Sequence, residues 1–315
     1  MLRGAVILGL FLLPGGVGCR VPGLRNFEGR GLAVTRTAAG REYALDVPPQ
    51  VALGKPVPLV VLLHGYGATG QGQATYFGLD AQVAKRGFLL AKPDGTRDTD
   101  GSGKRYWNAF PACCASVADS SPVDDVAFLM ALVNDVESAY PVDPDRVYLI
   151  GHSNGAFMAY RMACDHAETF AAVVALAGAV EPSLCHPSRP VSVAVVHGTQ
   201  DHVIKVEGGE TRRDRPYVSL ADTVDFWMKA DHCAGPLVSM GRDDLISNAV
   251  FRPRAIPGAE TDIERASGCA GGTTDVELWK IEGAGHVPLW NEGRWPTAAL
   301  DFLLRHRRSS AHSYP

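Results

Sequence analysis

The chain has 315 residues, 46% of them hydrophobic, and a formal net charge of −4 from 30 basic and 34 acidic side chains. A chain of this length and composition can bury the core of a single large domain. The balanced charge, without a basic stripe, argues against nucleic acid as a partner, and no apolar run reaches the ~20 residues that span a bilayer.

The N-terminus has the three parts of an export signal. Arg3 supplies a positive charge, residues 5–13 are apolar, and small residues follow up to Cys19. The segment Gly16-Val17-Gly18-Cys19 resembles the lipobox of bacterial lipoproteins, although Gly16 stands where such motifs usually carry Leu. We therefore expect export with a lipid anchor at Cys19. Secretion without an anchor, or a buried N-terminal strand without export, are the alternatives.

The next elements predict the edge and the centre of a sheet. Residues 31–47 are typical of two strands in an edge hairpin that turns at 38–41. Residues 59–63, Leu-Val-Val-Leu-Leu, form a continuous apolar run, as in a strand covered on both faces. This run leads directly into the glycine loop His64-Gly65-Tyr66-Gly67. We expect His64 itself to be structural, holding the loop by hydrogen bonds.

A helix is expected over 73–85 and a strand over 88–91. The polar loop that follows, over 96–121, is long, and it contains Trp107 and the adjacent pair Cys113-Cys114. Loops of this length are functional or disordered, and aromatic and cysteine side chains favour an ordered wall of a site. Trp107 is therefore a candidate substrate-binding residue. Anchoring of the loop on the core would explain it equally well.

A helix is predicted over 123–140, with Asp124 and Asp125 in its first turn. Acids at that end meet the positive end of the helix dipole, so we interpret the pair as structural rather than as a general acid/base pair or a cation site. Buried strands at 171–177 and 191–196 continue the alternation of strand and helix. Such alternation predicts a mostly parallel sheet covered by helices on both faces.

The most informative stretch is an apolar run at 147–150 followed by Gly151-His152-Ser153-Asn154-Gly155. It fits G-x-S-x-G, the nucleophile elbow, in which a strained strand-to-helix turn lifts the serine hydroxyl above a parallel sheet. We predict that Ser153 is the nucleophile and that the backbone N–H of Asn154, at the start of the following helix, is an oxyanion donor. An ordinary glycine-rich turn is the alternative.

The glycine loop after residues 59–63 is expected to supply the second oxyanion donor. In enzymes with a nucleophile elbow, a loop after an early strand brings a backbone N–H over the nucleophile. We assign this donor to Tyr66 or, failing that, to Gly67. A turn that merely reverses the chain is the alternative.

The acid and the base come later in the chain, each just after a predicted strand. Asp201 follows the strand at 191–196, and His286 lies on a glycine loop after a strand at 276–281. The order serine, acid, histidine is the one that elbow enzymes use. His286 would take the proton of Ser153 and return it to the leaving alcohol, while Asp201 would fix the imidazole tautomer. The competing candidates for the base are His232 and His306.

The remaining segments complete the predicted sheet. Helices are expected over 218–229 and 296–307, and the polar stretch 241–272 is predicted to be irregular. The sequence contains no C-x-x-C pair and no His/Cys cluster with metal-ligand spacing, so we expect no structural zinc.

Together these motifs resemble the poly(3-hydroxybutyrate) depolymerase-like esterases, relatives of the feruloyl and acetylxylan esterases, over residues 31–307. The segments that carry the resemblance are His64-Gly65-Tyr66-Gly67, Val123-Asp124-Asp125-Val126-Ala127-Phe128, the elbow with its strand, His197-Gly198-Thr199-Gln200-Asp201 and Gly283-Ala284-Gly285-His286. The resemblance implies an α/β-hydrolase fold, a mostly parallel central sheet flanked by helices on both faces. It also implies an exported ester hydrolase without a cofactor, whose triad is Ser153, Asp201 and His286.

The resemblance also bears on the cysteines. Apart from Cys19, six remain, an even number that suits an exported protein with disulfides, although several could be free core cysteines. The family implies a bond between Cys233 and Cys269, and Cys164 with Cys185 is a weaker expectation. The elbow departs from the family at His152, where relatives often carry a hydrophobic residue. His152 is therefore a second candidate for substrate binding.

The sequence thus predicts a signal at 1–19, a tether at 20–30, one catalytic domain at 31–307 and a tail at 308–315. The expected activity is that of a serine carboxylester hydrolase acting on a hydroxyalkanoate oligomer or on a plant-wall acyl or acetyl ester. A serine peptidase with the same triad is the alternative within enzymes. A surface lipoprotein that keeps the fold as a binding module is the alternative outside them.

Overall fold

A computed structural model of the chain describes residues 31–99, 101–114, 123–211, 215–247 and 258–308. The predicted signal with Cys19, the tether and all but the first residue of the tail lie outside these ranges. In the described part of the chain, none of the helices has the length and apolar character needed to cross a bilayer.

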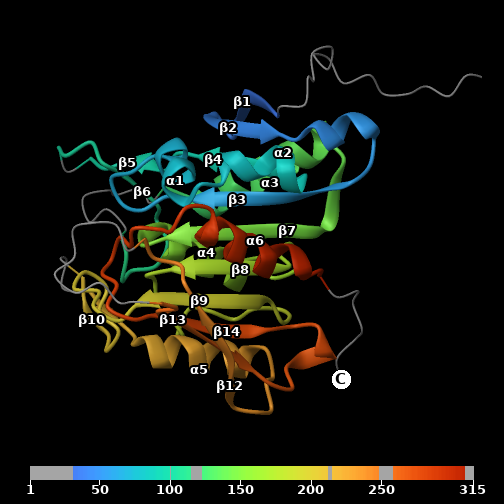
Figure 1. The fold of residues 1–315 in the computed structure, drawn as a ribbon. Helices are drawn as coiled ribbons and strands as arrows, with labels where there is room; N and C mark the ends of the chain where they lie inside the picture. The colour runs from blue at the N-terminus through green and yellow to red at the C-terminus, as the bar shows by residue number, and fades with distance from the viewer. Residues whose placement is uncertain (1–30, 100, 115–122, 212–214, 248–257, 309–315) are drawn as a thin grey trace, which may run out of the picture.

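The centre of the molecule is a ten-stranded sheet with the order β1-β2-β4-β3-β7-β8-β9-β14-β13-β12 (Figure 1). Its strands are β1 (Leu32–Ala38), β2 (Arg41–Val47), β3 (Val57–Leu63), β4 (Leu89–Pro93), β7 (Val142–His152), β8 (Ala172–Leu176), β9 (Ser192–Gly198), β12 (Leu237–Asp243), β13 (Thr261–Ala266) and β14 (Val276–Ile281). Strands β4, β3, β7, β8, β9 and β14 run parallel. An antiparallel pair is added at each edge. The predicted mostly parallel α/β sheet is confirmed.

Two smaller ladders and the helices complete the fold. The ladders pair β5 (Thr96–Arg97) with β6 (Arg105–Tyr106), and β10 (Gly209–Glu210) with β11 (Pro216–Tyr217). The helices are α1 (Gly70–Phe77), α2 (Val83–Arg86), α3 (Asp125–Ala139), α4 (Asn154–Asp165), α5 (Leu220–Ala230) and α6 (Arg294–Arg305). Short 3₁₀ turns are η2 (Pro49–Leu53), η3 (Asp80–Gln82) and η4 (Ala270–Gly272).

The core is divided by the sheet into two apolar layers. Alternate residues of β3 face opposite sides, so Val61 joins one layer and Val60 the other. Helices α3, α4 and α5 cover the first layer, and α1, α2 and α6 cover the second (Figure 1). Strands β3, β8 and β9 are buried along their whole length, which is why each appears in the sequence as an unbroken apolar run.

Several predicted elements are confirmed with shifted ends. The hairpin β1–β2 turns at Ala39 and Gly40, both with positive φ. Helix α3 begins after Asp124, whose carboxylate accepts a hydrogen bond from the N–H of Ala127 at 2.8 Å. The side chain of Asp125 is buried and paired with Arg41. Both acids therefore have the structural role predicted for them.

Two predictions about secondary structure are wrong. The single helix expected over 73–85 is interrupted at Gly78, which ends α1 in a left-handed conformation and is followed by η3 and α2. The stretch 241–272, expected to be irregular, contains the end of β12 and the whole of β13. Most residues of β12 are exposed, so the strand lacks the buried face that produces a recognisable apolar alternation.

Parallel strands place their carboxyl ends at one edge of a sheet. Strands β3, β7, β9 and β14 therefore deliver the loops that begin at His64, Ser153, Thr199 and Glu282 to the same edge. In open α/β sheets this edge is where ligands bind.

Candidate active site

The turn between β7 and α4 is strained at Ser153. Its φ of 54° and ψ of −123° lie outside the conformations that residues with a side chain usually adopt. The flanking glycines make this turn possible, because a Cβ on Gly151 would collide with the carbonyl oxygen of Gly155, and one on Gly155 would collide with that of Leu63. The predicted strand, sharp turn and helix are all present.

Three side chains that are far apart in the sequence form a continuous hydrogen-bond relay at this turn. Nε2 of His286 lies 2.9 Å from Oγ of Ser153, and Nδ1 of His286 lies 2.7 Å from Oδ2 of Asp201. Because a carboxylate only accepts, the Nδ1 of His286 must carry the proton. In a neutral imidazole Nε2 is then the acceptor for the serine hydroxyl.

Asp201 is held ionised by its surroundings. Its Oδ1 accepts hydrogen bonds from the N–H groups of Val203 at 2.8 Å and Ile204 at 2.9 Å. Burial by itself would raise the pKa of Asp201. The hydrogen bonds from His197, His286 and the Val203 N–H outweigh burial and hold that pKa well below its ordinary value.

The two other histidines considered as bases lie elsewhere. The ring of His306 is buried near the end of α6, where it pairs with Asp275 at 3.0 Å and contacts the carbonyl oxygen of Phe302 at 2.8 Å. His232 follows the end of α5. Among the candidates, only His286 is brought to the hydroxyl of Ser153.

His152 lies beside the relay as a neutral imidazole. Its Nε2 donates to the carbonyl oxygen of His286 at 2.9 Å, and the two rings lie 5.2 Å apart. Burial, followed by the proximity of His286, lowers the pKa of His152 to about 4. The ring also packs near Tyr76 and Phe77, with centroid distances of 5.7 Å and 6.2 Å. It is 7% exposed, so little of its surface is accessible.

The glycine loop after β3 narrows the choice of the second oxyanion donor. Gly67 donates its N–H to the carbonyl oxygen of Arg105 at 2.7 Å, so it does not have this group available. Tyr66 remains our candidate, and its phenol is 3.2 Å from a carboxylate oxygen of Asp98. His64 is structural as predicted: the N–H of Gly95 binds its Nε2, and its Nδ1 binds the carbonyl oxygen of Gly65, each at 2.8 Å.

Trp107 is not placed to contact a substrate, and here the expectation is corrected. The side chain has no exposed surface, and its indole N–H donates to the carbonyl oxygen of His64 at 3.0 Å. Trp107 thus anchors its loop on the core, the alternative explanation offered by the sequence. A long loop with an aromatic residue is compatible with both roles, because local sequence does not tell which way the ring points.

All six described cysteines form disulfides. Cys233–Cys269 and Cys164–Cys185 are the two expected pairs, and both are confirmed. The third joins the neighbours Cys113 and Cys114, whose adjacency in the sequence was the only available signal for the pairing. Within the described ranges, no group of three or more His, Cys, Asp or Glu side chains is arranged to hold a metal ion.

The fold and the elbow define the class of the protein, which is an α/β-hydrolase. The chain belongs to the phospholipase/carboxylesterase family, which it matches over residues 51–225. It is a hydrolase that acts on esters, and its similarity to known esterases supports this activity.

Individual relatives agree with this assignment. The chain is 30% identical to the esterase NocK of Nocardia uniformis subsp. tsuyamanensis over 83% of its own length and 73% of that protein. It is 27% identical to feruloyl esterase B of Piromyces equi over 78% of its own length, but spans 42% of that relative. The acetyl xylan esterase of Aspergillus awamori shares the fold, with a TM-score of 0.53, 16% identity and coverage of 86% of this chain and 100% of that one.

Proposed function

We propose that this ester hydrolase is an exported serine enzyme that works through an acyl-enzyme formed on Ser153. The observation that carries the proposal is the unbroken relay from the hydroxyl of Ser153 through His286 to the buried carboxylate of Asp201. An isolated serine hydroxyl is a weak nucleophile, and an adjacent base oriented by a third group is what activates it.

The proposed reaction has two halves. His286 accepts the proton of Ser153 at Nε2 as Oγ forms a bond to the carbonyl carbon of the ester. The resulting imidazolium, stabilised by Asp201, then gives this proton to the alkoxide oxygen as the ester C–O bond breaks and the alcohol leaves. A water molecule repeats the sequence on the acyl-enzyme, which releases the acid and restores the hydroxyl of Ser153.

The negative charge of each tetrahedral intermediate would be bound by two backbone N–H groups. Asn154 is the first residue of α4, and the first N–H groups of a helix have no partner within the helix. The helix dipole also favours negative charge at this end. Together with the N–H of Tyr66 from the facing loop, Asn154 would form the oxyanion hole.

We propose hydroxycinnamoyl or acetyl esters of plant-wall polymers as substrates, with hydroxyalkanoate oligomers as the competing class. The likeness to feruloyl esterase B and the sequence motifs support this choice. Exposed apolar side chains stand next to the proposed acid and base, at Val203 (55% exposed), Val287 (56%) and Leu289 (55%). They favour an ester with a large apolar part. His152, beside the relay, is our candidate contact for such a group.

Export is supported by the N-terminal pattern up to Cys19 and by the three disulfides. Disulfides persist in oxidising compartments and are rare in a reducing cytosol. We propose that the mature chain begins at a lipidated Cys19 at the cell surface or in the periplasm. Two measurements test the anchor. The wild-type protein from the membrane fraction should have the mass of a chain that begins at a lipidated Cys19, and the Cys19→Ala variant should be found in the soluble fraction.

A fluorophosphonate probe tests the nucleophile. The wild type should be labelled in one position, Ser153, and the Ser153→Ala variant should not be labelled. Equal labelling of the two proteins, or no labelling of the wild type, would refute the serine mechanism.

Turnover rates on a panel of esters test the substrate class. Methyl ferulate and acetylated xylan should be cleaved faster than hydroxybutyrate oligomers, and peptide substrates should be inert. Faster cleavage of the oligomers would transfer the assignment to the depolymerase group. Cleavage of short p-nitrophenyl esters alone would contradict both substrate classes, and amide cleavage would favour a peptidase.

A further inference from the structure

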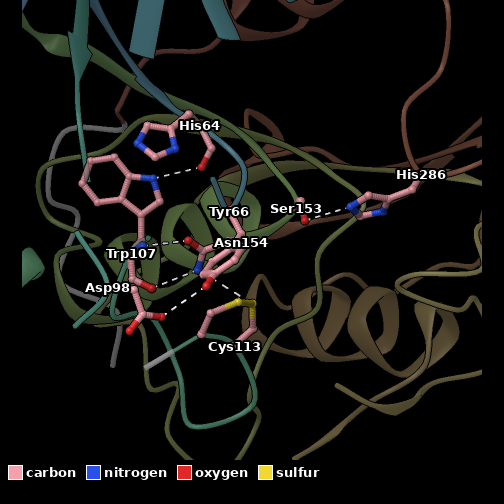
Figure 2. The surroundings of a disulfide bond; sticks show 9 residues. His64, Tyr66, Asp98, Trp107, Cys113, Ser153, Asn154 and His286 are labelled. Carbon is pink, nitrogen blue, oxygen red and sulfur yellow. Dashed lines mark hydrogen bonds between the residues drawn. A yellow bond between two sulfur atoms is a disulfide. The ribbon is translucent and has the colours of Figure 1, made fainter. Parts of the chain in front are cut away.

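Trp107 connects the two loops that carry the proposed oxyanion donors (Figure 2). Its indole N–H binds the carbonyl oxygen of His64, and its backbone N–H and C=O bind the side chain of Asn154. Resting on the proposed function, we infer that Trp107 is a positioning residue that sets the separation of the Tyr66 and Asn154 N–H groups. It touches neither the substrate nor the relay and would act through these two neighbours.

We call the hydrogen bonds that Trp107 makes to His64 and Asn154 the bridge. At one end, the bridge fixes the start of the loop that holds Tyr66. His64 is fully buried and cannot turn freely, because Nε2 accepts from Gly95 while Nδ1 donates to the carbonyl oxygen of Gly65. Burial lowers the pKa of His64, which keeps the ring neutral and able to make both bonds. The indole N–H of Trp107 adds a third restraint, on the carbonyl oxygen of His64, which lies two residues before Tyr66.

At the other end, the bridge holds the side chain of the residue that follows the nucleophile. Oδ1 of Asn154 accepts the N–H of Trp107 at 2.7 Å, and Nδ2 of Asn154 donates to the carbonyl oxygen of Trp107 at 2.9 Å. The side-chain amide of Asn154, with an oxygen that accepts and an NH₂ that donates, thus pairs with both the N–H and the C=O of Trp107. The residue whose backbone N–H would bind the oxyanion is therefore locked to Trp107 through its own side chain.

The loop that carries Trp107 is itself braced. Nδ2 of Asn154 lies 3.7 Å from Sγ of Cys113, which is joined to Cys114 (Figure 2). The next residue, Asn108, donates its backbone N–H to the buried carboxylate of Asp125 at 2.8 Å and its side-chain N–H to the carbonyl oxygen of Val123 at 2.9 Å. The bridge therefore rests on α3 as well as on the disulfide, and it provides a rigid support for both donors.

This geometry predicts an effect on the transition state rather than on substrate binding. Charge develops on the carbonyl oxygen only as Ser153 attacks, so donors that shift apart lose more contact with the transition state than with the ester. A misplacement of about 1 Å can cost ~10²-fold in rate. A role limited to core packing would instead lower stability and leave kcat of the folded enzyme unchanged.

The test is Trp107→Phe, with Trp227→Phe as its matched control. Trp227 is equally buried, on α5, but its indole N–H has no hydrogen-bond partner among the described residues. Trp107→Phe should lower kcat about 10- to 100-fold with KM changed less than about 2-fold. Trp227→Phe should lose thermal stability with kcat unchanged.

A boronic acid inhibitor, which forms a tetrahedral adduct with the serine, gives a second readout. Its affinity should fall in Trp107→Phe by about the same factor as kcat/KM, because the adduct uses the same donors. If Trp107→Phe does not fold, Asn154→Asp tests the other end of the bridge. An aspartate keeps the volume and one acceptor but cannot donate to the carbonyl oxygen of Trp107, so the same fall in kcat is expected.

The outcomes separate this inference from the proposed function. If the wild type is not labelled at Ser153, the serine mechanism fails and the bridge has no reaction to serve. In the other case, the wild type is labelled at Ser153 and hydrolyses its ester. If Trp107→Phe then has the same kcat and the same inhibitor affinity as Trp227→Phe, the inference about Trp107 is overturned and the serine mechanism stands.

Discussion

Two carboxyl groups with little exposed surface stand beyond opposite ends of β9, and they differ in the number of hydrogen bonds that they accept. Asp201 follows the carboxyl end of the strand and accepts hydrogen bonds from Val203, Ile204 and His286. Asp231 receives one bond, from the N–H of Val191 just before the strand, at 2.9 Å. Its other oxygen, Oδ2, has no partner among the described residues. The two residues are 4% and 0% exposed.

The comparison shows that the hydrogen-bond donors around a buried acid can reverse the effect of burial on its charge. Burial raises the pKa of both groups. At Asp201 the surrounding donors reverse the effect, whereas at Asp231 the single N–H of Val191 does not. One end of β9 therefore holds an anion suited to stabilise an imidazolium, and the other end holds a group that favours the protonated state.

The largest expected effect comes from removing the charge at the site. Asp201→Asn should lower kcat by about 10⁴-fold, because an amide can present its N–H to His286 and favour the wrong imidazole tautomer. The measurement is kcat on a soluble ester, with thermal unfolding recorded in parallel.

Asp222→Asn is the matched control for that variant. Asp222 is a carboxylate in the first turn of α5, where it caps the helix with Ser219 and does not contact the relay. Its substitution should leave kcat unchanged. A fall of less than about 10-fold in Asp201→Asn would show that the carboxylate does not orient His286.

His152 provides a second way to test the site end of β9, because the neutral state of its ring should be visible in the pH dependence of stability. The pKa of His152 is lowered from 6.5 to about 4. Between these values the unfolded chain binds a proton that the folded chain does not, so stability falls as the pH drops. The loss by pH 4 should be about 3 kcal/mol.

In His152→Gln this loss should disappear from the free energy of unfolding, measured by urea titration at intervals from pH 7 to pH 4. A glutamine keeps an N–H that can reach the carbonyl oxygen of His286, so the local hydrogen bond is matched. Parallel pH profiles for the two proteins would contradict the assignment of a buried, neutral ring.

The site end of the sheet could be predicted from sequence because its chemistry requires particular residues at particular places. Gly151 and Gly155 are needed for the approach of α4 to the sheet. Asp201 follows the apolar run of β9, and His286 follows the alternating pattern of β14. The fold class and the ester-hydrolase activity followed from these motifs, and the comparisons with known proteins agree.

The rest depended on contacts that leave no local pattern. Strand β12 is joined to the sheet by backbone hydrogen bonds while most of its side chains face solvent, so it resembles a loop. The burial of Trp107 and the single partner of Asp231 depend on segments 43 and 40 residues away. Residue type alone gives no indication of either.

Asp231 allows the opposite end of β9 to be tested. Because the pKa of Asp231 is raised in the folded chain, the folded state holds its proton more tightly, and stability is lost as the pH rises above the ordinary range for an aspartate. Asp231→Asn keeps an oxygen for the N–H of Val191 and replaces the ionisable carboxyl group with a neutral amide. It should therefore gain about 2 kcal/mol at pH 8, on the scale of one unsatisfied buried polar group.

The measurement is the free energy of unfolding of both proteins at pH 5 and pH 8, with kcat as the control for an unchanged site. The gain should shrink toward pH 5, where wild-type Asp231 is closer to its neutral form. An equal gain at both values would mean that the charge of Asp231 is not the cause, and a loss at pH 8 would show that the carboxylate has a partner that an amide cannot replace.

The smallest expected effect on the free energy of unfolding comes from the solvent-exposed cap of α5. The carboxylate of Asp222 accepts from both the N–H and the Oγ of Ser219, and this Oγ in turn accepts from the N–H of Asp222. These bonds form a capping box at the start of α5, the helix that Asp231 follows. Ser219→Ala removes the hydroxyl and should cost about 1 kcal/mol, since the exposed N–H groups can bind water instead. Urea unfolding measures this loss, and Ser239→Ala on the exposed strand β12 is the control. A cost above about 3 kcal/mol would mean that α5 depends on its cap as strongly as a core contact.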